Sequence, residues 1–107
     1  MEKVIFKDEL LFYFDELIFI LFGKEYFSYE ENATLYVDKI VDFIILEINS
    51  FPHKLTPQKL QYLGSHYIFY KANNRTTWYV FFEKKNQNYL IIGIINNHCE
   101  EAKNLYF

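Results

Sequence analysis

The spacing of the apolar residues changes once along the chain, and this change constrains the fold more than any other feature. Between residues 10 and 48 the apolar side chains recur every three or four positions, which is the period of one helix face. From residue 66 onward β-branched and aromatic residues dominate and the period becomes two, as in a strand. Pro52 separates the two patterns, because its ring lacks an N–H donor and clashes with a preceding helical turn. We therefore expect an α+β fold in which an N-terminal helical hairpin packs on a C-terminal antiparallel β-meander.

Two helices are predicted in the first half of the chain. Asp8 is suited to cap the first helix, and Gly23 is suited to end it. Ser28 followed by Glu31 is a capping-box pattern, so the second helix is expected over residues 29–49. The short segment between them makes the pair an antiparallel hairpin. The two apolar stripes consist of Leu10, Phe14, Leu17, Ile18 and Leu21, and of Ala33, Val37, Ile40, Val41, Ile44, Ile45 and Ile48.

The second half of the chain is predicted to be mostly strand. Residues 4–6 can supply a short first strand ahead of the helices. Further strands are expected over 66–72, 76–83 and 89–95, and two hairpins in sequence form an antiparallel meander. Both faces of the segment 76–83 are largely apolar, so this strand should be central in the sheet. Residues 53–65 show no clear period and are interpreted as a connecting loop.

The turns and the faces of this sheet can also be predicted. Asn73 and Asn74 suit a tight hairpin turn, because asparagine tolerates a positive φ. The tail after His98 can form one or two turns of helix. One face of the sheet should receive the helical hairpin, and the other face is expected to stay open to a partner or substrate.

Composition narrows the class of protein. A chain of 107 residues, 51% of them apolar, is expected to form a single packed domain over residues 1–107. Its longest apolar stretch is interrupted by Asp15 and Glu16, so no membrane span is expected. Cys99 is the only cysteine, which excludes an internal disulfide and a cysteine-based zinc site. Because the N-terminal segment also lacks the pattern of a secretory signal, we expect a cytoplasmic protein without metal or cofactor.

Charge is distributed unevenly between the two halves. Eleven acidic and four basic residues give residues 1–52 a net charge of −7. Three acidic and seven basic residues give residues 53–107 a net charge of +4, and all three histidines lie there. If the protein contacts a polyanion, the C-terminal half is therefore the expected region.

Three segments give the chain a resemblance to a known family. They are residues 12–27 (FYFDELIFILFGKEYF), 75–85 (RTTWYVFFEKK) and 89–98 (YLIIGIINNH). Together with a helical hairpin that precedes a meander, they resemble the RelE/ParE superfamily of toxin-antitoxin toxins, in a branch associated with Bacteroidetes. The resemblance implies a bacterial toxin that inhibits growth and is neutralised by a cognate antitoxin protein encoded beside it.

Members of this superfamily act in two ways, and the sequence leaves both open. RelE-like members are ribosome-dependent endoribonucleases that cut mRNA, whereas ParE-like members inhibit gyrase without that chemistry. The resemblance implies that the candidate catalytic residues are Lys71, Arg75, His98 and Tyr106. RNA-cleaving members usually display several arginines, but Arg75 is the only arginine of this chain and its net charge is −3. A non-enzymatic ParE-like toxin or a toxin-like protein-binding module is therefore kept as the alternative.

The four candidate residues suit phosphodiester chemistry. Cleavage through the 2′-OH of RNA needs a base, an acid and a cation that stabilises the phosphorane charge. His98 suits proton transfer because the unperturbed pKa of histidine lies near neutrality, and Arg75 and Lys71 suit a phosphate. Tyr106 could stack on a base. Each residue also has an ordinary structural role, as a turn, surface or packed residue, so their joint placement decides between the two interpretations.

Other features of the sequence point to partners rather than to chemistry. The acidic residues at positions 8, 9, 15 and 16 are interpreted as the solvated face of a helix rather than as paired catalytic carboxylates. His53 and His66 lack the spacing of metal ligands. The aromatic content of 21% predicts an exposed apolar surface that an antitoxin covers. We therefore expect self-association when the antitoxin is absent.

Overall fold

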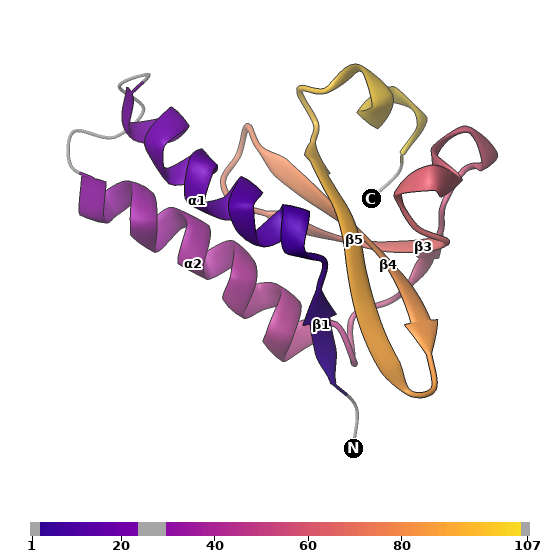
Figure 1. Ribbon diagram of the computed structural model, residues 1–107. Helices are drawn as coiled ribbons and strands as arrows, with labels where there is room; N and C mark the ends of the chain where they lie inside the picture. The colour runs from indigo at the N-terminus through magenta and orange to yellow at the C-terminus, as the bar shows by residue number, and fades with distance from the viewer. Residues whose placement is uncertain (1–2, 24–29, 106–107) are drawn as a thin grey trace.

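The computed structural model describes residues 3–23 and 30–105 and contains two helices on one face of a five-stranded sheet (Figure 1). The helices are α1 (Asp8–Gly23) and α2 (Glu30–Glu47). The strands are β1 (Val4–Phe6), β2 (Lys54–Leu55), β3 (His66–Lys71), β4 (Thr77–Lys85) and β5 (Asn88–Asn96). Two 3-10 helices are also present, η1 (Gln58–Leu63) and η2 (Glu100–Asn104).

The sheet is mixed, with the strand order β1-β5-β4-β3-β2. β1 runs parallel to β5, and every other neighbouring pair is antiparallel. The predicted α+β class and the meander β3-β4-β5 are confirmed, as are the short first strand and the central position of the strand with two apolar faces. β1 extends this sheet beyond the predicted meander, as a parallel edge strand beside β5.

Both helices form where the apolar spacing predicts them. α1 begins at Asp8 and ends at Gly23, while α2 ends at Glu47, two residues before the predicted end. The predicted cap at Ser28 lies outside the described residues. Ile45 is 49% exposed and does not belong to the buried stripe, because it follows the buried Ile44 by about 100° around the helix axis.

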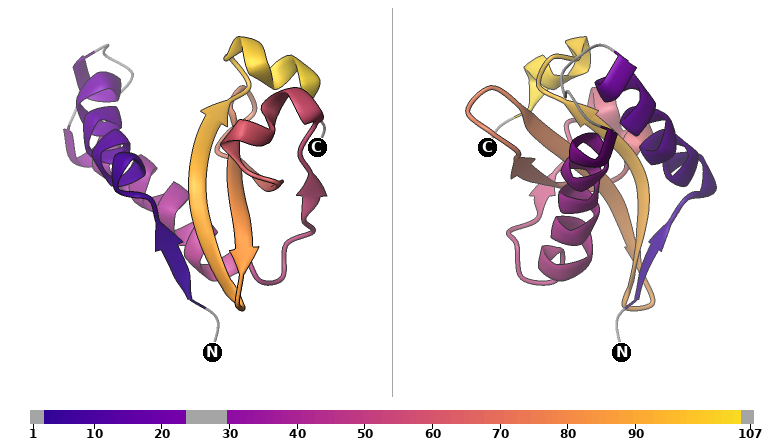
Figure 2. Two further views of the ribbon diagram at one scale, coloured as in Figure 1. Left: turned by 45° about the vertical axis from the view of Figure 1, so that its right-hand side comes forward. Right: turned by 90° about the vertical axis from the view of Figure 1, so that its left-hand side faces the viewer.

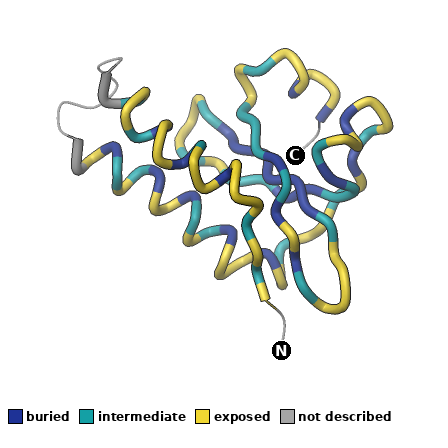
Figure 3. The backbone as a smooth tube through the Cα atoms, in the orientation of Figure 1, coloured by how far each residue is buried: buried dark blue, intermediate teal, exposed yellow. Residues whose placement is uncertain are grey.

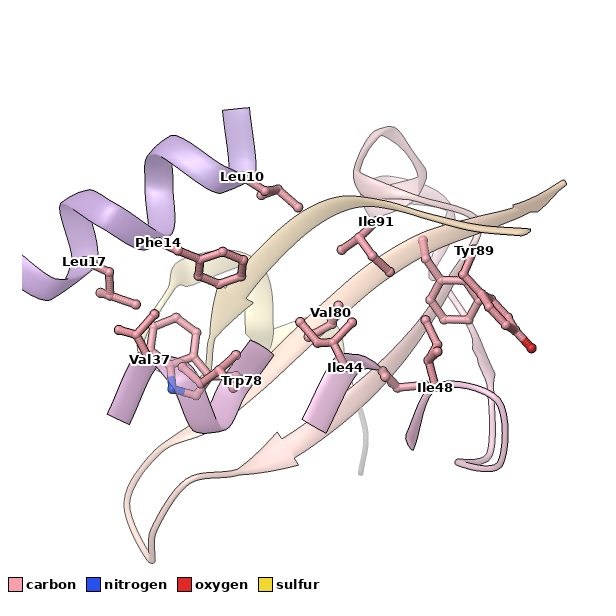
Figure 4. Packing of buried hydrophobic residues seen from close by; sticks show 13 residues of the cluster. Leu10, Phe14, Leu17, Val37, Ile44, Ile48, Trp78, Val80, Tyr89 and Ile91 are labelled. Carbon is pink, nitrogen blue, oxygen red and sulfur yellow. The ribbon is translucent and has the colours of Figure 1, made fainter. Parts of the chain in front are cut away.

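The main core lies between the helices and the sheet. α2 is the deeper helix, since its Ala33, Ile40 and Ile44 are 0% exposed. α1 adds Leu10, Phe14 and Leu17 to the same cluster, and Figure 4 shows their side chains pointing from α1 toward the sheet. Figure 3 shows the consequence along the backbone, with buried positions in mid-sheet and exposed positions on the outer sides of the helices. Within the described residues, neither helix is long and apolar enough to cross a membrane.

The opposite face of the sheet is also covered, which corrects the expectation of an open face. The left view of Figure 2 shows η1 and η2 on the side of the sheet away from α1 and α2. The sheet and these two segments share a second buried cluster, formed by Leu60, Tyr67, Tyr79, Phe81, Ala102 and Leu105. Because alternate residues of β4 point to opposite faces, its apolar run supplies both cores, and the flanking segments must cover the second one.

The segment 53–65 is more ordered than the predicted loop. Its first part forms β2, which pairs with β3, and its second part forms η1. Gly64 follows η1 with a φ of 147°, and a Cβ at this position would lie 2.7 Å from the backbone nitrogen of Phe82. Glycine is therefore required where this segment turns back onto the sheet.

The predicted tight turn lies in the other hairpin. The positive φ values expected at Asn73 and Asn74 occur instead at Asn86 and Gln87, with φ of 53° and 70°. These two residues connect β4 to β5 and fit the two-residue turn that matches the twist of paired strands. The β3–β4 connection is longer, and the side chain of Asn73 organises it as described below.

Candidate functional site

The β3–β4 loop and the turn after β5 meet at one end of the sheet, where asparagine side chains hold them. Oδ1 of Asn73 accepts hydrogen bonds from the backbone N–H groups of Arg75 (2.8 Å) and Thr76 (2.9 Å). Oδ1 of Asn97 accepts from the N–H of Thr77 at 2.9 Å, and Nδ2 of Asn97 donates to the carbonyl of Arg75 at 3.0 Å. The Asn73 bonds shape the loop itself, and the two Asn97 bonds link segments that lie 20 and 22 residues apart in the chain.

His98 is positioned by the residue that ends β5. Oδ1 of Asn96 accepts the backbone N–H of His98 at 2.9 Å, which fixes the start of the following turn. Nε2 of His98 lies 3.3 Å from Oγ1 of Thr76 in the β3–β4 loop. His98 itself is exposed. The imidazole is therefore held beside the loop while it remains accessible to a ligand.

These residues line an open pocket, which we call the Arg75–His98 corner. Its volume is about 510 Å³, and its lining residues are Asn73, Asn74, Arg75, Thr76 and His98. The structure thus brings two predicted site residues, Arg75 and His98, to the same pocket. Their proximity combines a permanent cation with an imidazole.

A second pocket, which we call the α1–sheet cleft, adjoins the corner. The left view of Figure 2 shows α1 and α2 leaning away from the sheet near the C-terminal end of β5. The cleft at this end has a volume of about 450 Å³ and shares Asn73, Thr76 and His98 with the corner. The remaining lining residues are Tyr13, Leu17, Ile20, Leu21, Tyr36, Trp78 and Asn96.

The tyrosines of the cleft are hydrogen-bonding groups rather than acids or bases at neutral pH. Burial raises the pKa of Tyr13, and the neighbouring Cys99 and Tyr36 raise it further. Burial also raises the pKa of Tyr36, although its hydrogen bond with Trp78 acts in the opposite direction. In that bond Nε1 of Trp78 donates to the hydroxyl of Tyr36 at 2.9 Å. The cleft therefore has an aromatic wall with neutral hydroxyl groups.

A third predicted site residue, Lys71, lies elsewhere in the sheet. Lys71 pairs with Thr77 in the β3–β4 ladder and lines neither the corner nor the cleft. Trp78 belongs to the core under the helices, so its neighbour Thr77 points to the opposite face of the sheet. Lys71 is paired with Thr77 and therefore lies on that face, away from the helices. Tyr106 lies outside the described residues. Of the three predicted site residues that the structure describes, the site therefore holds two, Arg75 and His98.

Sequence reasoning missed the residues that build the site. Asn96 and Asn97 have no predicted role, and Asn73 acts through its side chain rather than through a positive φ. The side chain of an asparagine often accepts a hydrogen bond from the backbone two residues later, so an asparagine at the start of a loop is a known signal for this kind of turn. No comparable local signal identifies Tyr13, Tyr36 and Trp78, since their role depends on how the helices lie over the sheet.

The site offers binding groups more clearly than catalytic ones. Arg75 is the only lysine or arginine among the residues that line the corner and the cleft, and His98 is the only imidazole. Among the described residues, no group of three or more His, Cys, Asp or Glu side chains could hold a metal ion. Comparison of the chain with protein-family models, with curated proteins and with solved structures finds no match.

Proposed function

We propose that the chain is the toxin component of a type II toxin-antitoxin system and that it acts by binding a protein target rather than by cutting RNA. The observation that carries this proposal is the opening of the Arg75–His98 corner directly onto the α1–sheet cleft. A cationic mouth beside an apolar cleft suits a protein segment with an acidic group next to an apolar side chain. The resemblance to RelE/ParE toxins supports the toxin role, with gyrase as the target implied by the ParE-like branch.

The distribution of charge favours a protein target over RNA. Grooves that bind single-stranded nucleic acid follow its backbone with several cations and stack its bases on exposed aromatic rings. Arg75 stands alone as a permanent cation at the corner, and Lys71 belongs to the other face of the sheet. Trp78 is 2% exposed, and its indole is already bonded to Tyr36, so it offers little surface for stacking.

A ribosome-dependent endoribonuclease is the second candidate, and one observation favours it. His98 and Arg75 line the same pocket, so one phosphodiester could contact both. In that mechanism His98 would transfer a proton and Arg75 would stabilise the developing negative charge. This candidate still needs a partner for the second proton transfer.

Growth inhibition after induced expression tests the proposal. We expect expression of the wild type to stop growth, and co-expression of an antitoxin encoded beside it to restore growth. Ile20→Lys should abolish inhibition, because Ile20 lines the cleft and is 42% exposed, so a lysine there blocks the apolar contact without unfolding the protein. Leu46→Lys is the matched control, since Leu46 lies on α2 outside the cleft and is 73% exposed.

The same strains distinguish the two candidates. For a binding toxin, His98→Ala retains the growth defect, and a translation extract shows no codon-dependent mRNA cuts. For a nuclease, His98→Ala abolishes the cuts while Ile20→Lys leaves them. Wild-type expression without any effect on growth would contradict both candidates.

A further inference from the structure

α1 contains a repeat of seven residues whose outward positions are exposed in the structure. Residues 8–14 read DELLFYF and residues 15–21 read DELIFIL, so acidic, apolar and aromatic residues recur at the same heptad positions. Seven residues are close to two helical turns, so equivalent residues of the two heptads lie on the same side of the helix. The same pattern of side chains therefore recurs along one side of α1.

The outer side of this helix exposes two large aromatic rings. Leu10, Phe14 and Leu17 face the core and are 5–7% exposed. Phe12 and Phe19, one heptad apart, are 71% and 66% exposed. The two phenylalanines therefore lie in line along one helix face, and aligned exposed aromatic rings mark an interaction surface more often than a single scattered apolar residue does.

Four carboxylates flank the two rings. Helical spacing puts Asp8 and Asp15 along one side of the Phe12–Phe19 strip and puts Glu9 and Glu16 along the other. All four are exposed. Nζ of Lys7 lies 3.9 Å from a carboxylate oxygen of Glu9, but both side chains are more than half exposed, so this contact offsets little of the charge. We call the six residues the Phe12–Phe19 ridge.

We infer that the Phe12–Phe19 ridge binds a basic amphipathic helix of another protein. An apolar seam on that helix would pack on the two phenylalanines, and lysine or arginine residues on both sides of the seam would pair with the flanking carboxylates. This is the charge arrangement that selects partners in paired helices. The inference does not depend on the proposed function, because the corner and the cleft include none of the six ridge residues.

The charge of the ridge favours a basic helix over two other possible partners, a second copy of the chain and an anionic membrane. A second copy of the chain would bring one acidic ridge against another, and like charges at a helix interface destabilise it. A membrane with anionic lipids would also repel the four carboxylates, since surface binding of helices relies on lysine and arginine. A basic helix is the partner whose charge complements the ridge.

The interface should be small and its affinity moderate. α1 has 16 residues and so is about 24 Å long, and the ridge covers two heptads of it. This surface is smaller than that of a standard stable complex, so a dissociation constant on the order of micromolar is expected for the isolated helix pair.

Titration with a designed peptide tests this inference. The probe is a synthetic helix of three heptads with a leucine seam flanked by lysines, and its matched control has glutamates in place of the lysines. We expect the full chain to bind the lysine peptide and not the glutamate peptide in calorimetry at low salt. Replacing Phe12 and Phe19 together by Ala should weaken binding about tenfold or more, because buried aromatic anchors dominate such interfaces.

Charge variants separate specific pairing from general attraction. Asp15→Asn with Glu16→Gln should weaken binding severalfold and reduce its salt dependence. Asp38→Asn with Asp42→Asn removes the same charge from exposed positions of α2 and should leave binding unchanged. Leu46→Ala is the apolar control, and the far-ultraviolet circular dichroism of each variant confirms that it is folded.

Four outcomes would overturn the inference. They are failure of the lysine peptide to bind, equal binding of the glutamate peptide, equal weakening by the α2 charge variant, and no change when both phenylalanines are replaced. Self-association of the wild type that the Phe12→Ala and Phe19→Ala pair removes would assign the ridge to a second copy. Binding to phosphatidylglycerol vesicles that the same pair removes would assign it to a lipid surface.

Discussion

The two ends of the sheet both carry histidines, but their surroundings differ. We define the closed end by His53, His66, Phe82, Glu83 and Tyr89, near the β4–β5 hairpin. We define the open end by the Arg75–His98 corner and the α1–sheet cleft. At the closed end His53 and His66 pack against aromatic rings and make hydrogen bonds, although His53 is exposed, whereas at the open end His98 lies exposed beside a pocket. The sequence alone does not distinguish the three histidines, and their different surroundings in the fold give them different roles.

The closed end holds its imidazoles among aromatic rings. Nε2 of His53 lies 2.6 Å from the carbonyl oxygen of Ile48, and its ring centroid lies 4.9 Å from that of Phe82 and 5.7 Å from that of Tyr89. The ring of His66 stacks on Phe82 from the other strand, with 6.1 Å between centroids. Phe82 thus contacts both histidines and is 0% exposed.

A hydrogen-bonded chain fixes His66 further. The backbone N–H of Ser65 donates to Oε2 of Glu83 at 2.9 Å, and the Ser65 hydroxyl donates to Oε1 of the same carboxylate. Nδ1 of His66 lies 2.9 Å from that hydroxyl oxygen. Because the hydroxyl proton is already donated to Glu83, Nδ1 of His66 must be the donor in its bond with Ser65. The open end has no such chain, and His98 contacts only the hydroxyl of Thr76 among the hydrogen bonds of its side chain in the described residues.

The largest expected effect on stability comes from removing the ring of Phe82, which contacts both histidines at the closed end. Phe82→Ala should lower the free energy of unfolding by about 3–5 kcal/mol, because it leaves a cavity among buried rings. Ile20→Ala at the open end is the comparison and should cost less than about 1 kcal/mol, because Ile20 is 42% exposed. Chemical denaturation of the two variants measures both values. Equal losses would show that the closed end is no more tightly packed than the open one.

The next effect concerns the bonds that assemble the open end. Asn97→Ala removes the acceptor for the N–H of Thr77 and the donor to the carbonyl of Arg75, so it should lower the free energy of unfolding by about 1–2 kcal/mol. Asn74→Ala is the matched control, because Asn74 is exposed and lines the same pocket. Thermal denaturation compares the two variants, and an equal shift in Tm would show that the hydrogen bonds of Asn97 do not stabilise the open end.

A smaller effect compares the histidines directly. His53→Ala should cost about 1 kcal/mol, because it removes a hydrogen bond to Ile48 and contacts with two rings. His98→Ala should cost less than about 0.5 kcal/mol, because the His98 side chain makes one long contact, 3.3 Å to Thr76, whereas His53, which is also exposed, packs against two rings. Urea denaturation checks the difference. A larger loss for His98→Ala would mean that His98 is a structural residue and would remove it from the candidate site.

The sequence predicts most of the fold because helices and hairpins follow from local spacing. The buried stripe of α2 and the apolar run of β4 are visible as periods of residues that are close in the chain. The second core is not predictable in this way, because Leu60 and Ala102 are far apart in sequence and join one cluster only when the chain folds. The covered face, which was expected to be open, follows from these distant contacts.

The candidate site is only partly predictable, and the face of the sheet on which each strand residue lies explains why Arg75 and His98 belong to it while Lys71 does not. Arg75 and His98 come together because each follows a strand at the same end of the sheet. The face occupied by Lys71 depends on the register of β3 against β4, where Lys71 pairs with Thr77. A shift of one residue would move Lys71 to the other face, and the longer β3–β4 loop hides that register from the sequence.

The smallest expected effect is a loss of thermal stability at alkaline pH that arises at the open end. Burial raises the pKa of Tyr13 at the open end above the ordinary value of 10.0, and Cys99 and Tyr36 add to the rise. A group whose folded pKa is raised contributes stability that is fully present below its unfolded pKa and is lost as the pH rises through its folded pKa. We therefore expect Tm to be steady below about pH 10 and to fall above it. Tyr13→Phe should reduce this fall because it removes one of the buried phenols, whereas Tyr62→Phe, at a position that is 69% exposed, should leave it unchanged. An alkaline fall that is identical in the wild type and in Tyr13→Phe would show that Tyr13 is not desolvated and that water fills the cleft around it.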